Sequence, residues 1–402
     1  MSIVIGAILY FMFSSFVYAQ DTNIAEQMAL NNAVEIAIKN NPGILIAQKE
    51  LEVVFARKLQ TTALPNPELE GEWVGEDSKI GLSQLFEFPT KYFLKNSIGD
   101  YEIEIEKAKL EKAKYLLIAD VKKAYYKIIL SKKIIENIKS TIDLLKQFLE
   151  ITNIKYKSGK VAYLEVVRVK VELAKSKNEL IEEKKEFLIQ QQELNLLLGR
   201  KSNESFMLTQ NMIYEPFNKN IEQVQNEILK KNYALKIAKL SLGKSEKNKS
   251  LGWSSLLPDF NISVYKSRAG ELSGWGAEFK MSIPLYFWME QTGKIKEASA
   301  NLDSNQIKLE AVRKNIISAI KNTYESVQAN EEQVKNFEQN LLPEVEDGLK
   351  TGINNYQTGQ IDVLNLIDIY RTYKFARIER EKTLYNYLES LANLEIAGEE
   401  KE

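Results

Sequence analysis

Hydrophobic residues recur at alternating steps of three and four along the stretch from about Lys91 to Tyr156, and no proline interrupts it. Such a heptad seam is typical of long helices that pack side by side, as in coiled coils. At about 1.5 Å per residue, the stretch predicts a helix roughly 100 Å long. A second helical pattern follows from Leu164 to Leu198 and is closed by Gly199. The seam consists of Leu110, Ala113, Leu117, Val121, Ala124, Ile128, Ser131, Ile135, Ile138, Ile142, Leu145, Leu149, Thr152 and Tyr156.

The hydrophobic period changes to two residues in two places, each preceded by a leucine–proline breaker and followed by a proline. In residues 67–88, apolar and polar positions alternate on both sides of an expected turn at 75–78. In residues 259–283, an expected loop at Arg268–Ser273 separates two alternating runs. Each run is about as long as the ~9–11 residues of a tilted membrane β-strand. The pattern therefore predicts one β-hairpin in each half of the chain.

The same order of elements occurs twice, which indicates an internal duplication. Pro343 is expected to bend the second of the long helices. The predicted boundaries are 20–210 for the first repeat and 211–402 for the second. The predicted helices, in chain order, span residues 31–40, 42–63, 91–156, 164–198, 221–231, 233–251, 290–356 and 362–397.

Two short stretches that lie 200 positions apart have nearly the same sequence pattern. Each consists of a tyrosine, two polar residues and a glycine, and an apolar run begins again after it. Glycine suits the left-handed residue that ends a helix. We therefore predict the tips of two helical hairpins, at residues 156–160 and 356–360. Their candidate functional residues are Tyr156, Ser158, Gly159, Tyr356, Thr358 and Gly359.

The N-terminal residues 1–19 form an apolar run that ends in Val17-Tyr18-Ala19. A small residue at the end of such a run predicts a signal peptide that is cleaved after Ala19, although the usual basic start is missing. A buried or anchoring N-terminal helix is the alternative. No other stretch approaches the ~20 apolar residues of a membrane helix. An exported protein is therefore expected.

Composition narrows the possible chemistry. The chain of 402 residues contains no cysteine and no histidine, which excludes disulfides, thiolate or imidazole metal sites, a lipid anchor on cysteine, and histidine-based catalysis. The formal net charge is −1, so the basic excess typical of nucleic-acid binding is missing. We expect no enzyme activity, no cofactor, no metal site and no nucleic-acid partner.

The hairpins raise a problem of closure. Four strands with an apolar face cannot close a barrel, and in lipid every strand edge must be paired. Two copies of the chain would supply eight strands and three copies twelve. The alternative is that both hairpins pack on helices in an ordinary α+β core. An interfacial girdle would explain the tryptophans in or near the hairpins, and burial in such a core explains them nearly as well; they are Trp73, Trp253, Trp275 and Trp288.

The chain resembles the TolC-type outer membrane efflux channels. The resemblance is carried by the opening from Ala33 to Pro42, the leucine–proline breakers, the prolines after each hairpin and the paired tips. The run from Gln84 to Lys91 is similar to a segment of the divalent-cation-efflux subgroup. The resemblance implies a mainly α protein with a minor β part. Three chains would form one α-barrel across the periplasm and one 12-stranded barrel in the lipid of the outer membrane, and would dock to a periplasmic adaptor and an inner-membrane pump.

The resemblance also assigns roles to residues near the tips. The tip positions would form the closed periplasmic entrance and meet the adaptor, and Tyr356 would take part in gating. Ile361 stands where relatives carry a basic gating residue. Asp368, joined by Asp362, would form a ring of carboxylates that attracts cations, as carboxylate rings do in other pores. A solvated surface carboxylate is the alternative for both.

Two classes of function follow from these patterns. The first is a passive outer membrane exit duct of a tripartite efflux or secretion system, gated at its periplasmic end. The second is an exported periplasmic coiled-coil adaptor or scaffold without a pore. For the exit duct, the sequence does not identify the transported substrate, which can be metal ions, drugs or proteins.

Overall fold

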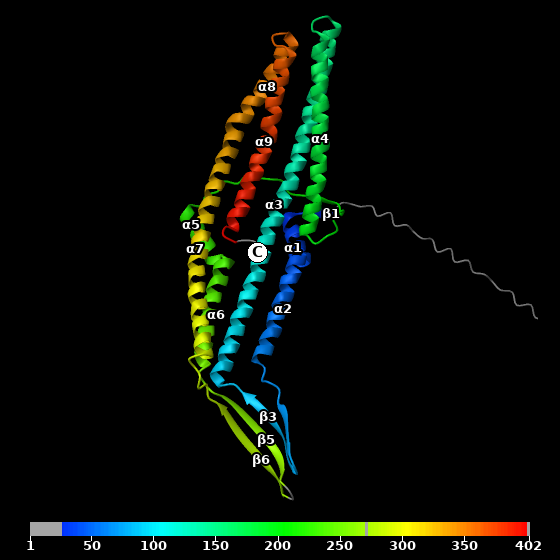
Figure 1. Ribbon diagram of the computed structural model, residues 1–402. Coiled ribbons are helices and arrows are strands. Elements are labelled where there is room, and N and C mark those ends of the chain that lie inside the picture. Colours follow the sequence, from blue (N-terminus) through cyan, green and yellow to red (C-terminus); the bar gives the residue numbers. More distant parts are fainter. Residues whose placement is uncertain (1–25, 270–271, 400–402) are drawn as a thin grey trace, which may run out of the picture.

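A computed structural model describes residues 26–269 and 272–399, and the chain is mainly helical with a small β part. The expected signal peptide at residues 1–19 lies outside the described residues. The molecule is elongated, with a β-sheet at one end and two helical tips at the other (Figure 1). The elements up to residue 208 are β1 (Glu26–Met28), α1 (Leu30–Asn40), α2 (Pro42–Thr62), β2 (Glu68–Val74), β3 (Asp77–Phe86), α3 (Pro89–Lys157), α4 (Tyr163–Leu197) and β4 (Phe206–Leu208).

The remaining described elements follow the same order of short helices, hairpin and long helices. They are α5 (Ile221–Lys231), α6 (Tyr233–Ser254), β5 (Asp259–Ala269), β6 (Leu272–Ser282), α7 (Glu290–Asn336), the π-helical turn η1 (Phe337–Leu341), α8 (Leu342–Thr358) and α9 (Val363–Glu395). The assignment of residues 20–210 and 211–402 to two repeats stays a prediction.

The longest helix, α3, has 69 residues and forms the spine of the molecule. All positions of its predicted seam are buried or half-buried except the last, Tyr156. Val121 and Leu145 are fully buried. Because the apolar stripe runs the whole length, helices can pack against α3 at every level.

The helices lie side by side in one layer (Figure 1). On the sheet side of the molecule the neighbours run in the order α2, α3, α6 and α7, and on the tip side the order is α4, α3, α9 and α8. The short helices α1 and α5 pack on α3 and α7 at mid-length. A single layer leaves the two outer helices of each level with an uncovered side.

The predicted bend at Pro343 coincides with the π-helical turn η1, directly before α8. Proline has no N–H to donate to the preceding turn, so the α-helical hydrogen bonds are interrupted there. A π-helical turn, which closes each bond over one more residue than the α-helix does, accommodates this interruption. Arg380 of α9 braces this point, since its Nη2 lies 2.6 Å from Glu338 Oε1.

The two hairpins join into one antiparallel sheet with the strand order β2-β3-β5-β6. Both hairpins were predicted, but two details were wrong. The loop expected at Arg268–Ser273 is mostly strand, because the ladder continues to the pair Ala269–Leu272. The first turn is shorter than expected, because β3 begins at Asp77, which pairs with Val74. Backbone pairing needs no apolar side chains, so it extends beyond the alternating pattern.

The register gives the sheet one apolar and one polar face. Directly opposed residues share a face, and one such row is Leu69, Leu82, Val264 and Ala277. The next row, on the other face, contains Glu68, Ser83, Ser263 and Glu278. The apolar face is open along the sheet; its exposed large side chains are Leu69, Trp73, Ile80, Leu82, Ile262, Val264, Trp275, Phe279 and Met281.

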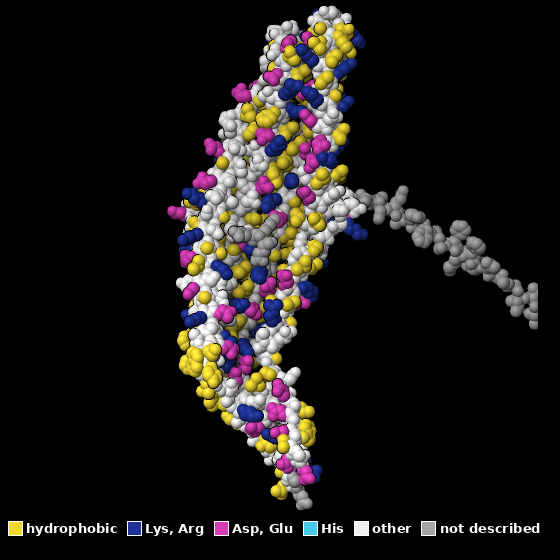
Figure 2. All heavy atoms as spheres, viewed as in Figure 1, with side chains coloured by type: hydrophobic (Ala, Val, Ile, Leu, Met, Phe, Trp, Pro, Cys, Tyr) yellow, Lys and Arg dark blue, Asp and Glu magenta, His cyan; other side chains and the backbone are white. Residues whose placement is uncertain are grey.

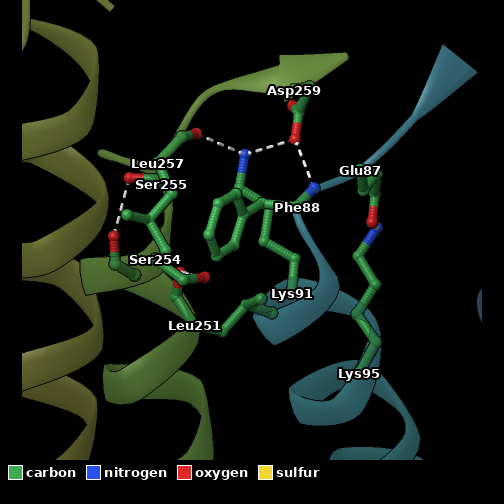
Figure 3. Close-up of polar contacts among 10 residues, drawn as sticks. Glu87, Phe88, Lys91, Lys95, Leu251, Ser254, Ser255, Leu257 and Asp259 are labelled. Carbon is green, nitrogen blue, oxygen red and sulfur yellow. Dashed lines mark hydrogen bonds and ion pairs between the residues drawn. The ribbon is translucent and has the colours of Figure 1, made fainter.

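Polar contacts fix the sheet to the helical layer (Figure 3). Asp259 Oδ1 accepts hydrogen bonds from the backbone N–H of Phe88 at 3.0 Å and from Lys91 Nζ at 2.8 Å. Lys91 Nζ also donates to the carbonyl of Leu257 at 3.0 Å. These bonds tie the start of α3 to the start of β5, so the helices and the sheet are joined without a flexible linker.

A second, two-stranded sheet was not predicted. β1 and β4 pair in parallel, in the register Glu26–Phe206 to Met28–Leu208. Three-residue strands carry too little alternation to be recognised from the sequence. Phe206 and Met28 are buried beside α1 and α3, so this pairing closes the core at mid-length.

Candidate functional site

The first tip joins α3 to α4 in a tight, hydrogen-bonded turn. Gly159 has φ 70°, and the N–H of Lys160 donates to the carbonyl of Lys155 at 2.9 Å. Ser158 Oγ donates to the same carbonyl at 2.9 Å. This is the glycine-terminated helix end that the sequence predicts. Tyr156 is 44% exposed, and its ring packs 5.4 Å from that of Tyr163.

The second tip joins α8 to α9 with the same backbone geometry. Gly359 has φ 85°, and the N–H of Gln360 donates to the carbonyl of Asn355 at 2.8 Å. Thr358 Oγ1 donates to that carbonyl at 3.1 Å. Asp362 caps α9, because its Oδ1 accepts from the N–H of Asn365 at 2.9 Å. Both tips thus have a fixed shape before any partner binds.

Tyr356 differs from its counterpart Tyr156, because only 1% of it is exposed. Its hydroxyl lies 2.9 Å from Thr152 Oγ1 and donates to Glu165 Oε2 at 3.2 Å. Lys155 Nζ lies 4.3 Å from the centre of its ring and donates to its carbonyl oxygen. Burial raises the pKa of the Tyr356 phenol to about 12, so the hydroxyl is neutral at physiological pH. Tyr356 therefore fastens the second tip to the helices of the first.

A charged pair joins the two helical hairpins further from the tips. Arg371 of α9 donates from Nε to Glu172 Oε1 at 3.0 Å and from Nη2 to Glu172 Oε2 at 2.6 Å. The guanidinium lowers the pKa of Glu172, and the carboxylate raises the pKa of Arg371. Glu172 is buried, and two-point pairing of this kind fixes both distance and orientation.

Two further contacts extend this junction along α4 and α9. Ser176 Oγ lies 3.2 Å from the hydroxyl of Tyr370, and Lys374 Nζ lies 2.6 Å from Glu179 Oε2. Because all of these bonds connect helices from different halves of the chain, they must break if the two hairpins separate. We name the contacts of Tyr356, Glu172–Arg371, Ser176–Tyr370 and Lys374–Glu179 together the hairpin junction.

The predicted carboxylates lie on an exposed side of α9. Asp362 and Asp368 are both exposed, and with Asn365 they fall at helical spacing toward the second tip. This side is separate from the buried stripe of Leu366 and Tyr370 that packs in the core. The carboxylates can therefore face a lumen or a second copy of the chain.

Sequence reasoning identified the tips but missed the Glu172–Arg371 pair. Glu172 lies between Val169 and Ser176 on the buried stripe of α4. A carboxylate at a core position of a helix requires a partner, and that was the available signal. The partner itself lies 199 residues away and follows only from the packing of α4 on α9.

Within residues 26–269 and 272–399, no group of three or more acidic side chains is placed to hold a metal ion. No helix in these ranges combines the length and the apolar character needed to cross a membrane.

A layer of long helices that carries an antiparallel sheet at one end and paired tips at the other defines the outer membrane channel fold. The chain matches the outer-membrane channel OprN with a TM-score of 0.79 and 15% identity, over 92% of this chain and 90% of OprN. CusC matches with a TM-score of 0.79 and 15% identity, over 92% of this chain and 91% of CusC. VceC from Vibrio cholerae matches with a TM-score of 0.75 and 15% identity, over 91% of this chain and 94% of VceC.

The sequence itself assigns the family. The outer membrane efflux protein family model matches residues 95–200 and 224–397, so the chain belongs to this family. It is an outer membrane protein of efflux transport that extends into the periplasm. A relative is the cobalt-zinc-cadmium resistance protein CzcC of Cupriavidus metallidurans, which is 20% identical over 359 residues, or 88% of this chain and 86% of CzcC.

Proposed function

We propose that the chain is the passive outer membrane duct of a tripartite efflux system, built as a homotrimer and gated at its periplasmic tips. It would catalyse no reaction, and energy would come from an inner-membrane pump. The observation that carries this proposal is the open sheet with one apolar and one polar face. In water the apolar face would be a large exposed patch, whereas in a barrel it would face lipid while the polar face lines a lumen.

The direction of the edge strands supports closure with further copies. Three antiparallel pairings lead from β2 through β3 and β5 to β6, so the two edge strands, β2 and β6, run in opposite directions. β6 of one copy can therefore pair with β2 of the next, and the antiparallel alternation continues around the ring. A barrel of eight strands is just filled by its own side chains, so two copies would leave no passage. Three copies would provide twelve strands and an open lumen.

The helical layer also has an edge that suits contact with a neighbouring copy. Helix α2 is one of the two outer helices on the sheet side, and it exposes a series of large apolar residues. A neighbouring copy that covers them would close the helical layer into a cylinder. The same three copies that supply twelve strands would then supply a cylinder that is continuous with the barrel. These residues are Leu45, Ile46, Val53, Phe55 and Leu59.

We assign the gate and the adaptor contact to the tips. Tyr156, Ser158 and Gly159, with Thr358 and Gly359 of the second tip, would meet the periplasmic adaptor. Tyr356 was expected at this contact as well, but only 1% of it is exposed, so we assign it to the gate alone. Tyr356 and the hairpin junction would hold the entrance closed, since opening it requires the hairpins to separate. Asp368, with Asp362, would line the constriction and attract cations, because both carboxylates lie on the exposed side of α9.

The substrate class to test first is the divalent transition metal ion. The relative CzcC is named for cobalt, zinc and cadmium resistance. A duct passes what its pump supplies, so this proposal concerns the system rather than a binding site in the chain.

The test of the duct is purification followed by electrical recording. The mature chain should require detergent, migrate as a heat-sensitive oligomer and conduct ions in planar bilayers. A chain that stays in solution without detergent and gives no conductance would overturn the proposal and favour the periplasmic scaffold.

A further inference from the structure

One aromatic side chain lies on the polar face of the sheet. In the register of the described strands, Tyr265 of β5 shares a row of this face with Glu70, Gly81 and Gly276. Figure 2 shows acidic and basic side chains among hydrophobic ones on the sheet. Contact with lipid does not explain an aromatic ring on this face. The other aromatic residues of the four strands lie on the apolar face; they are Trp73, Phe86, Phe260, Trp275 and Phe279.

Two glycines flank Tyr265 and leave room for its side chain. Gly276 is its direct partner on β6, and a Cβ atom there would lie 2.5 Å from Cζ, 2.6 Å from Cε2 and 2.8 Å from Oη of Tyr265. Gly81 is its partner on β3, and a Cβ atom there would lie 2.6 Å from Cβ of Tyr265. Glycine within a strand often marks such a close approach. The end of the phenol ring therefore packs directly on the backbone of Gly276.

An ion pair covers the ring in this position. Lys79 Nζ lies 3.9 Å from the centre of the Tyr265 ring and 3.2 Å from Glu278 Oε2. Lys79 lies two residues from Gly81 on β3, and Glu278 lies two residues from Gly276 on β6, so the pair spans the row of Tyr265 diagonally. A cation near the face of an aromatic ring is attracted to it. The ring is therefore held both by the backbone of Gly276 and by the ammonium group of Lys79.

We propose that Tyr265 and Gly276 set the bore of the barrel, because the glycine lets the ring lie against the wall instead of projecting into the lumen. The inference rests on the proposed duct, in which the polar face of the sheet lines the lumen. Side chains of a strand stand roughly perpendicular to the sheet, so a tyrosine without this recess extends toward the axis. Each further copy brings the same ring to the same level. The barrel thus has a size limit of its own, separate from the gate at the tips.

The test measures how large a solute can enter the barrel from its sheet end. Polyethylene glycols of increasing size are added to the compartment that faces this end, and single channels are recorded in planar bilayers. A polymer that enters the barrel lowers the conductance, and it reaches the level of Tyr265 before it reaches the tips. The largest polymer that still has this effect reports the bore. Gly276→Ala should lower this size limit, because the added methyl group displaces the ring into the lumen.

Two further variants isolate the effect of the ring. Gly274→Ala is the matched control, because Gly274 lies on the same face of β6 two residues away, and a Cβ atom there meets nothing within 4 Å. It should leave the size limit unchanged. When Tyr265→Ala has removed the ring, adding Gly276→Ala should have no further effect on the size limit.

The outcomes separate the bore from the duct. If Gly276→Ala leaves the size limit unchanged, or still lowers it in the absence of the ring, Tyr265 does not set the bore and the duct stands. If the wild-type chain does not conduct, the duct itself is refuted. If Gly276→Ala forms no heat-sensitive oligomer, Tyr265→Trp replaces it, because an indole is larger than the phenol that the recess accommodates. Tyr265→Trp should then lower the size limit, and an unchanged limit would overturn the proposal.

Discussion

The hydroxyl of Tyr356 is the point at which the two helical hairpins meet near their tips. Its bonds to Thr152 and Glu165 cross from one half of the chain to the other. A typical intramolecular hydrogen bond contributes about 1 kcal/mol net, which changes an equilibrium roughly fivefold. Thr152 keeps a second bond, from its Oγ1 to the carbonyl of Phe148 at 2.7 Å, so loss of the phenol does not leave it unpaired.

Tyr356→Phe should therefore raise the open fraction of the channel roughly fivefold while the chain folds normally. Single-channel recording in planar bilayers measures this fraction. Tyr156→Phe is the matched control, because the ring of Tyr156 is exposed at the other tip and lies outside the hairpin junction. An equal effect of both substitutions would remove Tyr356 from the gate.

The Glu172–Arg371 pair predicts how the gate responds to acid. Arg371 lowers the pKa of Glu172 below its ordinary value of 4.5. The stabilisation that this shift provides is fully present above the ordinary pKa and is lost as the pH falls through the lowered one. Channel conductance should therefore rise below about pH 4.5.

Glu172→Gln should open the channel more often at neutral pH and flatten this acid response. The control is Glu179→Gln, which removes the pair with Lys374; the side chain of Glu179 is 48% exposed against 7% for Glu172, so its loss should have the smaller effect. The measurement is the difference between the pH profiles of variant and wild type, since other carboxylates titrate in both. An unchanged profile in Glu172→Gln would show that the pair stays intact during opening.

Asp368 is the residue expected to make the constriction attractive to cations. Asp368→Asn removes the charge with little change of volume and should weaken block by divalent cations in single-channel recordings. Asp362→Asn tests the second carboxylate, and asparagine preserves the cap of α9. If block by divalent cations is unchanged in Asp368→Asn, Asp368 does not line the constriction.

At the scale of elements, a lysine substitution should have different effects on the two faces of the same strand. Val264 lies on the apolar face of β5, and Ser267 lies on the polar face three residues further along. Lysine in the lipid-facing position should cost about 2–4 kcal/mol near the middle of the bilayer. Val264→Lys should lower the yield and thermal stability of the membrane oligomer, and Ser267→Lys should affect them less. In a soluble scaffold Val264 is merely exposed, and Val264→Lys would leave stability unchanged.

How much of these elements the sequence predicts depends on the range of the interaction. The seam from Leu110 to Thr152 predicts α3, and the alternation around Leu82 predicts its strand, because both patterns reflect local burial. The pairing of β3 with β5 connects residues about 180 positions apart, as in Leu82–Val264, and no local pattern encodes it. The tips followed from Gly159 and Gly359, whereas the Glu172–Arg371 pair depends on packing between halves. The predicted roles of the tip residues stay predictions.

At the scale of the whole molecule, one chain is an incomplete object. Its sheet has two free edges, β2 and β6, and its helices form one layer with an uncovered outer helix on each side. Unpaired strand edges are unfavourable in lipid and invite pairing in water, and an exposed apolar face is unfavourable in water. Further copies can pair the strand edges and cover the outer helices at the same time, because the hydrogen bonds of Asp259 join the sheet to the helical layer.

The number of copies can be argued from the lumen. A ring of two chains would have eight strands, and the side chains of its polar face would fill the interior. A ring of three would leave a passage, so conductance and a threefold mass should occur together. Native mass spectrometry of detergent-solubilised protein, with planar-bilayer recording of the same preparation, tests this pairing. Dimers that conduct would contradict the twelve-stranded barrel. Trimers that do not conduct, even with the Tyr356→Phe substitution that loosens the tips, would contradict the duct but not the trimeric assembly.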